Sequence, residues 1–352
     1  MRNHVFRSLP RGLIAAIVLA VPVIAAHAAS APLRVGVSGA SSDAVFYIAA
    51  KKNYFKDEGL AVVFTPFDSA AKMVAPLGAG QLDIGGGSPS AGLYNAVARG
   101  IDIKIVADKG STPPGYGFQP LLVRKDLVDS GRYKTLKDLK GMKIAGSAPG
   151  SASTATLHQA LKRAGLKTSD VERVFMGFPQ HVAALQNQAV DAALTTEPSA
   201  TKAVQSGAAV RVMGDDQIYP HHQLAVVLYA GSFVHADPDA ARRFMRAYLR
   251  AARDYNDALK GGKLAGPAAE EIIAILTEYT RIKDPKVYRT ITPQGTDPDG
   301  RLNVESLKAD LAFFREEGQV KGKVTVEQVV DSSFVEAAVK ALGPYKPRAG
   351  TK

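Results

Sequence analysis

The chain has 352 residues, which is long for one domain and suits two, and its 46% of hydrophobic and 22% of charged residues are typical of a globular protein with a sizeable core. It contains no cysteine, which excludes disulfides, thiol catalysis, iron–sulfur clusters and cysteine-ligated zinc. The formal net charge of +11 comes without a run of five basic residues or interleaved basic and aromatic residues, so we expect no nucleic-acid partner.

Residues 1–28 have the pattern of a secretory signal peptide. Three arginines come first, an uncharged apolar run follows over 12–26, and the small residues Ala26 and Ala28 mark a cleavage site. The run is too short to span a membrane comfortably, which argues against an anchor. We therefore expect the mature chain to begin near Ala29 with a net charge near +8. Because it has no cysteine to carry a lipid, we expect it to be free in the periplasm, with no lipid anchor.

After the signal peptide, short strand patterns alternate with helical patterns, which is typical of βαβ units and a parallel sheet. Asp68 and Ser69 cap one predicted helix. Ser88 and Pro89 open another, with proline in the first turn, where its missing N–H costs nothing. The expected strands are 33–37, 61–67, 82–85 and 101–107, and the expected helices are 43–52, 69–78 and a third from residue 88.

Proline and glycine residues between positions 108 and 118 interrupt this alternation, and a second series of the same kind follows. Beyond residue 237 the pattern is almost wholly helical, and apolar residues from Ala241 to Tyr255 trace one face of a long amphipathic helix. The expected strands of the second series are 142–145, 171–176, 192–195 and 210–213, and its expected helices are 151–163, 181–188 and 197–206.

Two βα series separated by a break predict an α/β fold of two lobes joined by two hinge crossovers. The helical tail has no sheet of its own, so the economical chain path returns to lobe one and packs the tail there. A cleft between two open α/β sheets is where ligands bind, at strand C-termini and helix N-termini. The expected divisions are signal peptide 1–28, lobe one 29–118, hinge 119–124, lobe two 125–223, hinge 224–229 and the second part of lobe one 230–352.

Five short runs occur in register between about residue 32 and residue 206, and together they resemble the nitrate/sulfonate/taurine and thiamine-precursor branch of ABC-importer binding proteins. The resemblance implies a two-lobed, hinge-bending fold, a small ligand in the cleft and a membrane permease as partner. The runs are LRVGV at 33–37, YFKDEGL at 54–60, GQLDIG at 80–85, LKGMKIA at 139–145 and VDAALTTEP at 190–198.

Three loops rich in glycine and serine follow predicted strands, at 38–42, 85–90 and 147–154. Glycine lets a backbone approach a ligand closely, and hydroxyls beside a helix N-terminus suit an oxyanion. Any one loop could equally be a plain turn or helix cap, but three at corresponding sheet ends favour ligand contact. The candidate binding residues in these loops are Ser38, Gly39, Ala40, Ser88, Pro89, Ser90, Ser151 and Ala152.

Five further residues are weighed between a binding role and a structural one. Tyr47 can stack on a ligand or sit in the core, and Phe118 and Gln119 stand at the entrance of the predicted hinge. Phe178 begins a lobe-two helix, and Glu197 either binds a ligand amine or hydroxyl or caps its own helix. Adjacent histidines at 221 and 222 have no acidic neighbours in sequence, so we expect no metal site.

These observations predict the substrate-binding component of an ABC importer for a small organic anion of the sulfonate or aromatic-carboxylate type. The alternatives are a neutral, pyrimidine-like ligand and a ligand-sensing receptor not coupled to transport. Relatives that make a thiamine pyrimidine carry a cysteine- and histidine-rich segment, which this chain lacks, and no nucleophile elbow, Walker loop or Rossmann motif occurs. We therefore expect no enzymatic activity, no cofactor and a monomer.

Overall fold

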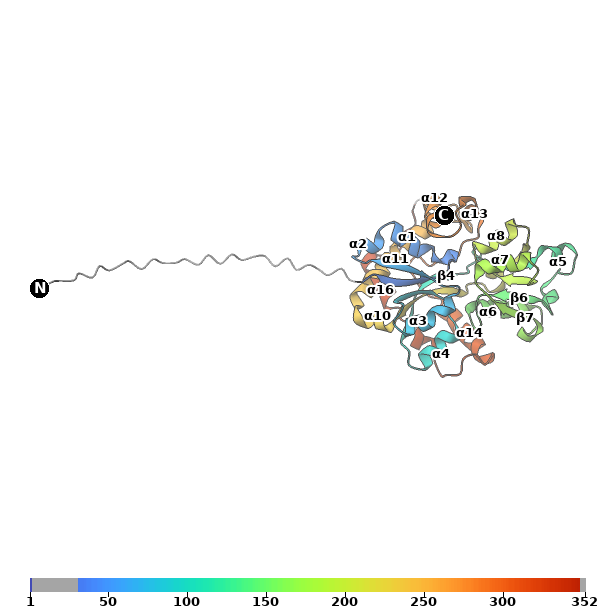
Figure 1. The fold of residues 1–352 in the computed structure, drawn as a ribbon, viewed down its shortest axis with the longest axis horizontal. Helices are drawn as coiled ribbons and strands as arrows, with labels where there is room; N and C mark the ends of the chain where they lie inside the picture. Colours follow the sequence, from blue (N-terminus) through green and yellow to red (C-terminus); the bar gives the residue numbers. More distant parts are fainter. Residues whose placement is uncertain (2–30, 349–352) are drawn as a thin grey trace. The chain divides into compact units, whose positions relative to one another are not determined.

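The computed structural model describes Met1 and residues 31–348. Apart from Met1, the predicted signal peptide lies outside the described residues. Within the described part of the chain, no helix combines the length and the apolar character that a membrane crossing needs. From Pro32 onward the chain forms one unit in which two sheets with flanking helices make two lobes, which confirms the predicted α/β class (Figure 1).

The sheet of lobe one is built from parallel strands with one antiparallel insertion. Val35 lies opposite Ile84 on one side and Phe64 on the other, in parallel pairs. The order is β2-β1-β3-β10-β4, and β10 runs antiparallel to both of its neighbours. The strands are β1 (Leu33–Val37), β2 (Val62–Pro66), β3 (Ile84–Gly87), β4 (Ile103–Ser111) and β10 (Gln223–Ala230).

The sheet of lobe two repeats this arrangement in the order β7-β6-β8-β5-β9, with β5 antiparallel to its neighbours. Successive side chains of a strand point to opposite faces, so Leu121 and Val123 join one apolar cluster while Leu122 joins another. The sheet is therefore covered by apolar side chains on both faces. Its strands are β5 (Leu121–Arg124), β6 (Lys143–Gly146), β7 (Glu172–Phe175), β8 (Ala192–Leu194) and β9 (Ala209–Met213).

The two segments expected to be hinges form inner strands of the sheets. Residues 121–124 of the expected hinge 119–124 form β5, and 224–229 lie within β10, whose residues are all buried. Continuous apolar runs of this kind suit strands covered on both faces, not flexible connections. The chain crosses between the sheets at 112–120 and again at 214–222, which includes the short helix α9 (Asp215–Ile218).

Helices flank both sheets, and they begin and end close to the positions that their sequence patterns predict. Helix α4, for example, starts after Ser90, whose hydroxyl oxygen accepts the Leu93 N–H. The helices of lobe one before the first crossing are α1 (Ala44–Lys51), α2 (Tyr54–Asp57), α3 (Val74–Gly78) and α4 (Ala91–Ala98), and those of lobe two are α5 (Lys125–Asp129), α6 (Ala152–Arg163), α7 (Phe178–Gln186) and α8 (Ser199–Gln205).

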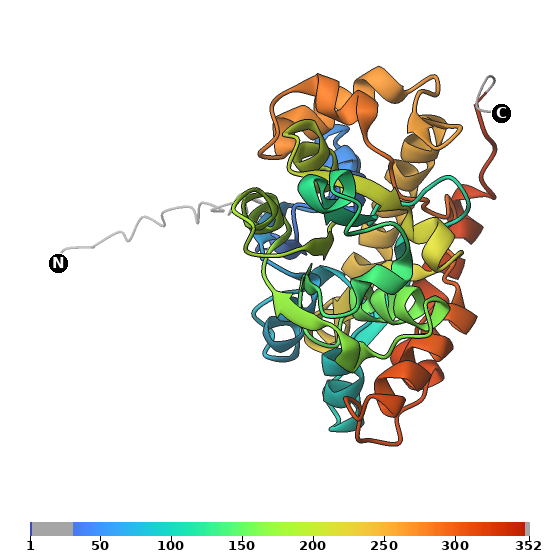
Figure 2. The same cartoon turned by 90° about the vertical axis from the view of Figure 1, so that its right-hand side faces the viewer.

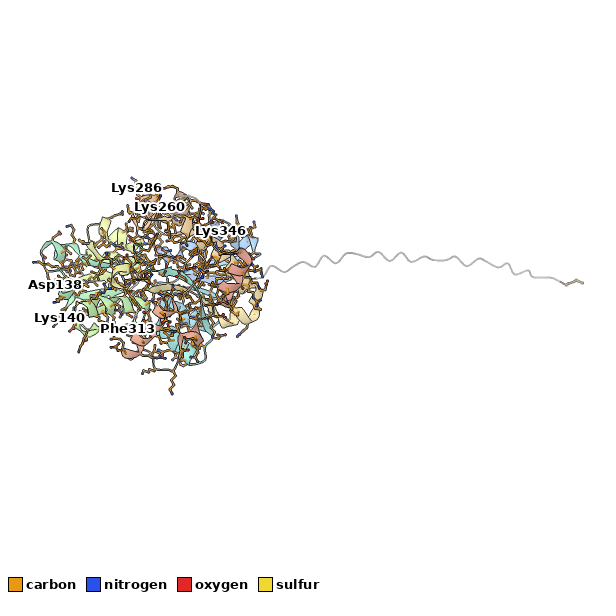
Figure 3. The ribbon with its side chains drawn as sticks, turned by 180° about the vertical axis from the view of Figure 1, so that it is seen from behind. Asp138, Lys140, Lys260, Lys286, Phe313 and Lys346 are labelled. Carbon is orange, nitrogen blue, oxygen red and sulfur yellow. The ribbon has the colours of Figure 1, made fainter. Side chains whose placement is uncertain are left out.

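The helical tail packs on lobe one, and its longest helix is α11 (Pro238–Asp257), where a single amphipathic helix was predicted. The rings of Phe244 and Tyr248 of this helix pack against Phe46 of α1 in tilted pairs. The tail also reaches lobe two, because the ring centroids of Phe313 and His158 are 4.5 Å apart. Figure 2 shows the tail in orange and red, and Phe313 is labelled in Figure 3. The other tail elements are α10 (Gly231–Ala236), the hairpin β11–β12 (Leu259–Lys260 and Lys263–Leu264), α12 (Ala269–Tyr279), α13 (Pro285–Thr290), α14 (Val304–Glu316), α15 (Val326–Val329) and α16 (Ser333–Leu342).

The two lobes touch along the edges where their parallel strands end. Ser90 and Ser151 form an isolated antiparallel bridge, and the Ala91 N–H donates to Gly150 O at 2.8 Å. These contacts place the N-terminus of α4 in lobe one against the N-terminus of α6 in lobe two. The lobes are therefore closed on one another.

Candidate ligand-binding site

A small cavity lies between the closed lobes, with about 40 Å³ of space open to water. That space holds a few waters or a small head group, whereas sites for organic ligands usually span about 300–1,000 Å³. An organic ligand therefore requires the lobes to part before it enters. The lining comprises Ser38, Ala40, Ser42, Ala70, Ala71, Gly86, Gly87, Ser88, Lys109, Phe118, Gln119, Ser147, Ser151, Ser153, Phe178, Thr196, Leu224 and Ala225.

The carboxylate of Asp43 fixes the first loop of this cavity from behind. Asp43 belongs to a short 3-10 helix that follows β1, and its Oδ2 accepts the backbone N–H groups of Ser38 and Ala40 at 2.9 and 3.2 Å. These bonds satisfy donors that a tight loop would otherwise leave unpaired. The loop thus presents Ser38 and Ala40 to the cavity in a defined conformation.

Lys109 is the basic side chain in the cavity wall, and the sequence patterns did not single it out. It lies near the end of β4 and is 1% exposed, with its Nζ 2.8 Å from Ser42 Oγ and 2.8 Å from Asp43 Oδ1. A Cβ on Gly86 would stand 2.8 Å from Lys109 Cε and 2.9 Å from Gly36 O, so only glycine leaves room for the lysine stem. The available signal was a basic residue just after the predicted strand 101–107.

Lobe two contributes hydroxyl groups at the start of α6 and an aromatic ring at the start of α7. Ser147, Ser151 and Ser153 line the cavity, and the Ser151 hydroxyl donates to Ala148 O at 2.9 Å. A helix N-terminus carries unpaired N–H groups and a partial positive charge. Phe178 adds an apolar surface beside these polar groups.

Gln119 closes the cavity from the first crossing segment. Its backbone N–H donates to Asp215 Oδ1 at 3.0 Å, which fixes the backbone, while its side chain lines the cavity. The residue is 2% exposed, and its Oε1 has no hydrogen-bond partner. A buried polar atom without a partner is rare in folded proteins and is costly unless a ligand or water satisfies it.

Seven of the thirteen candidate residues named from the sequence line the cavity, among them Ser88, Gln119 and Ser151, and six do not. Gly39 is exposed in a turn, and Pro89 offers its carbonyl to the Ser88 hydroxyl. Ser90 caps α4, and Ala152 is buried in a small cluster with Phe118 and Leu224. The cavity-lining candidates are Ser38, Ala40, Ser88, Phe118, Gln119, Ser151 and Phe178.

Tyr47 is a core residue of lobe one. It is 4% exposed, and its ring stacks on Tyr279 of α12 at 5.3 Å and meets Phe64 edge-on. Of the two roles considered from the sequence, the structure therefore shows the packing role.

Glu197 lies beside the cavity without lining it. Its Oε2 accepts the Thr201 N–H at 2.9 Å near the start of α8, and its Oε1 lies 3.3 Å from Arg211 Nη1. Burial raises the pKa of this carboxyl group, an effect that the Thr201 N–H and the Arg211 charge oppose. Its backbone carbonyl accepts the Ser41 N–H from lobe one at 2.8 Å. Of the two roles considered for Glu197, the structure shows the contact with the start of α8. Its backbone carbonyl also joins lobe two to lobe one.

The two adjacent histidines, His221 and His222, have different environments. His221 is exposed, whereas His222 is buried in the second crossing segment with its Nε2 2.8 Å from Asp310 Oδ2 and its Nδ1 3.1 Å from Thr156 Oγ1. Within residues 31–348, no group of three or more histidine or acidic side chains is arranged to hold a metal ion. The contacts of His222 instead join the tail, the crossing segment and α6.

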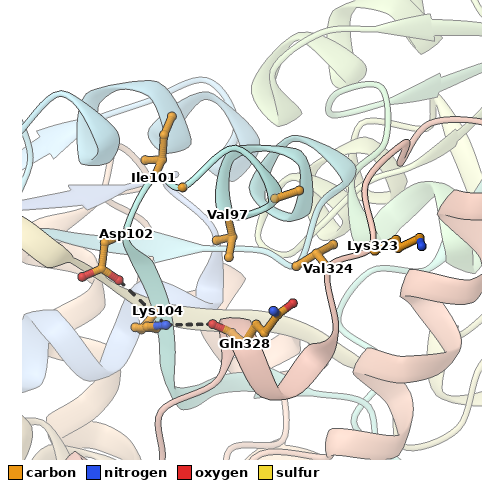
Figure 4. Close-up of a pocket in the computed structure, with 9 residues that line it drawn as sticks. Val97, Ile101, Asp102, Lys104, Lys323, Val324 and Gln328 are labelled. Carbon is orange, nitrogen blue, oxygen red and sulfur yellow. Dashed lines mark hydrogen bonds and ion pairs between the residues drawn. The ribbon is translucent and has the colours of Figure 1, made fainter.

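A larger hollow of about 450 Å³ lies on the surface of lobe one, away from the cleft (Figure 4). Val97 and Ile101 line it on one side, and Lys104 spans it by donating to Gln328 O at 2.7 Å. Its lining residues all belong to lobe one and its tail, so lobe closure does not enclose it. The cavity between the lobes is therefore the candidate site.

Two lobes that enclose a polar cavity define the class of two-lobed binding proteins, and comparison with known proteins agrees. Residues 41–258 match the NMT1/THI5-like family model, so the chain belongs to that family. This confirms the resemblance found in the sequence, since the relatives include sulfonate- and taurine-binding proteins.

Two curated relatives and one solved structure illustrate this similarity. The chain is 30% identical to a putative aliphatic sulfonates-binding protein of Escherichia coli over 56% of its length, and the match spans 59% of that relative. It is 25% identical to the taurine-binding periplasmic protein of the same organism, over 82% of this chain and 88% of that one. The alkanesulfonate-binding protein SsuA from Xanthomonas axonopodis, bound to MOPS, shares the fold with a TM-score of 0.66, at 20% identity over 86% and 99% of the two chains.

Proposed function

We propose that the protein is the periplasmic substrate-binding component of an ABC importer and that it binds a small organic anion of the sulfonate or aromatic-carboxylate type. The observation that carries this proposal is the composition of the cavity wall. Six serines, a buried lysine and a buried glutamine line the cavity, and no acidic side chain is among its lining residues in the described chain. Ammonium and backbone N–H groups donate to an anion, and serine hydroxyls can donate to it as well.

The apolar part of the wall suits an organic remainder on the acidic group. Phe118, Phe178 and Leu224 lie among the polar groups, so the ligand meets both kinds of surface. Ligand sites commonly combine an apolar lining with a few polar groups that fix orientation. The names of the sulfonate- and taurine-binding relatives support the same class of ligand.

A binding screen tests the ligand class. The protein released from the periplasm by osmotic shock is titrated with alkanesulfonates, taurine, benzenesulfonate, benzoate, nitrate and a neutral aminopyrimidine. Calorimetry should show saturable binding of at least one organic anion and no chemical change in it. Binding of the pyrimidine alone, or turnover of a bound compound, would contradict the proposal.

An uptake measurement distinguishes a role in transport from a role in sensing. Cells that lack the protein should lose high-affinity uptake of the labelled anion and regain it with the intact gene. Normal uptake in the deletion strain, together with loss of a transcriptional response to the anion, would support a sensing receptor instead. Recovery of the protein with the membrane fraction after osmotic shock would contradict the predicted free periplasmic location.

A further inference from the structure

We propose that Lys109 recognises the acidic group of the ligand, through one N–H of its ammonium group and through the Ser42 hydroxyl. This inference rests on the proposed function and deepens it, because it assigns the charge recognition to one buried pair of side chains. Both residues line the cavity, and they are 1% and 2% exposed.

The ammonium group of Lys109 has donor capacity left for a ligand. An ammonium has three N–H groups, and one of them donates to Ser42 Oγ at 2.8 Å. Asp43 Oδ1 lies 2.8 Å from the same Nζ, yet no aligned hydrogen bond joins the two atoms. At least one N–H therefore has no partner among the described residues.

The cavity lining includes the positive member of the ion pair, Lys109, and not the negative member, Asp43. Oδ2 of Asp43 accepts the N–H groups of Ser38 and Ala40, and Asp43 itself does not line the cavity. The carboxylate thus offsets the cost of burying the lysine without facing the ligand. An anion in the cavity meets the ammonium first.

Ser42 extends this recognition by one hydroxyl. Its oxygen accepts a hydrogen from Lys109, which leaves its own O–H free to donate, and no other hydrogen bond occupies it. A hydroxyl that accepts from an ammonium is a stronger donor than an isolated one, because chained hydrogen bonds polarise one another. The ligand anion therefore accepts two hydrogen bonds from this corner of the cavity.

The test compares 1-butanesulfonate with its neutral counterpart 1-butanesulfonamide in the parent and in variants, by calorimetry. The double variant Lys109→Met/Asp43→Asn removes both charges, and its asparagine oxygen still accepts the Ser38 and Ala40 N–H groups. We expect it to stay folded and to bind the sulfonate about tenfold to a hundredfold more weakly, with little change for the sulfonamide. Ser42→Ala should weaken sulfonate binding about fivefold.

Lys104→Met is the matched control, because Lys104 lies on the same strand but donates to Gln328 O outside the cleft. Its affinity for the sulfonate should equal that of the parent. If the double variant is folded and binds the sulfonate as tightly as the parent, Lys109 has a structural role only and the inference is wrong.

Two further outcomes complete the test. If the double variant does not fold, Ser42→Ala decides, since it leaves the ion pair intact, and unchanged sulfonate binding there would overturn the inference. If the parent binds no organic anion at all, the proposed function fails together with this inference. An anion-binding parent with insensitive variants overturns the inference alone.

Discussion

Ser88 and Ser90 stand two positions apart and have separate roles. Ser88 lines the cavity, whereas the Ser90 hydroxyl oxygen accepts the Leu93 N–H as the cap of α4. Ser88→Ala should therefore weaken binding of the anion about tenfold with an unchanged melting temperature. Ser90→Ala should lower the free energy of unfolding by about 1 kcal/mol and leave the affinity nearly unchanged.

Calorimetry and denaturant unfolding of both variants measure these two effects. Ser151→Ala is expected to behave like Ser88→Ala, because Ser151 lines the same cavity from lobe two. In both serines the hydroxyl hydrogen now donates to a nearby carbonyl oxygen, so it must rotate to reach a ligand. Equal affinities of the parent and all three alanine variants would show that the ligand does not use the serines.

Asp215 gives the protein a predicted pH dependence of stability. Burial raises its pKa to about 7, and its Oδ2 has no hydrogen-bond partner. In the unfolded chain an aspartate titrates near about 3.9, so between about pH 4 and about pH 7 the folded state binds more protons. The free energy of unfolding should therefore fall as the pH rises through this window.

Asp215→Asn should reduce that fall, since its amide oxygen still accepts the Gln119 N–H and no charge is buried at neutral pH. Asp108 on β4 has its pKa raised to about 7, likewise by burial, so part of the pH dependence should remain in the variant. Denaturant unfolding at about pH 5 and about pH 8 measures the difference. An equal change in the free energy of unfolding between these two pH values in parent and variant would contradict a raised pKa of Asp215.

The sequence predicted the hydroxyl part of the site but not its charged part. Ser38 and Ser88 follow strands directly and Ser151 ends the loop after β6, so a rule about loops at strand ends finds them. Lys109 was not found, because its burial depends on Asp43, a partner 66 positions earlier, and on the space left by Gly86. Contacts at such separations are set by the tertiary fold, which a local pattern does not contain.

At the level of elements, βα alternation predicted nearly every strand, but it did not show that the two expected hinge segments are inner strands of the sheets. In the sequence, β5 and β10 look like isolated extended segments. In the structure, each lies between two strands of its sheet and runs antiparallel to both of them. Their apolar runs did indicate burial on both faces. The sequence does not show which strands pair with one another, since β10 pairs with β3 through residues about 140 positions apart.

The packing of β10 against β3 predicts a coupling between Gly87 and Leu228. A Cβ on Gly87 would stand 2.4 Å from Leu228 Cδ1, inside the core of lobe one. Gly87→Ala should therefore lower the free energy of unfolding by about 1–3 kcal/mol. In combination with Leu228→Ala, which makes room, the cost should be smaller than the sum of the single costs by about 1 kcal/mol.

Denaturant unfolding of the two single variants and the double variant completes this double-mutant cycle. Purely additive costs would contradict a contact between the side chains at positions 87 and 228.

For the whole molecule, closure of the lobes is the property on which we expect ligand binding to depend. The cavity is too small in the closed form for an organic ligand to pass, and the edges of the lobes meet through single hydrogen bonds such as Ala91 N–H to Gly150 O. The free protein should therefore populate an open form, and the ligand should shift it to a closed form in which the lobes fit around the ligand. The crossing segments 112–120 and 214–222 are where we expect the bending.

A disulfide between the lobes tests this directly, because the chain has no native cysteine that could mispair. Ser90 and Ser151 are opposite residues of an antiparallel bridge, whose Cα atoms are typically about 4.5–5.5 Å apart, within the range that a disulfide spans. The oxidised Ser90→Cys/Ser151→Cys protein should be locked closed, with the radius of gyration of the liganded parent even when ligand is absent. It should bind added ligand far more slowly than its reduced form. Each single cysteine variant, which cannot form the bridge, is the control for changes in the capping of α4 and α6. Equally fast binding by the oxidised and reduced double variant would show that entry does not require the lobes to separate.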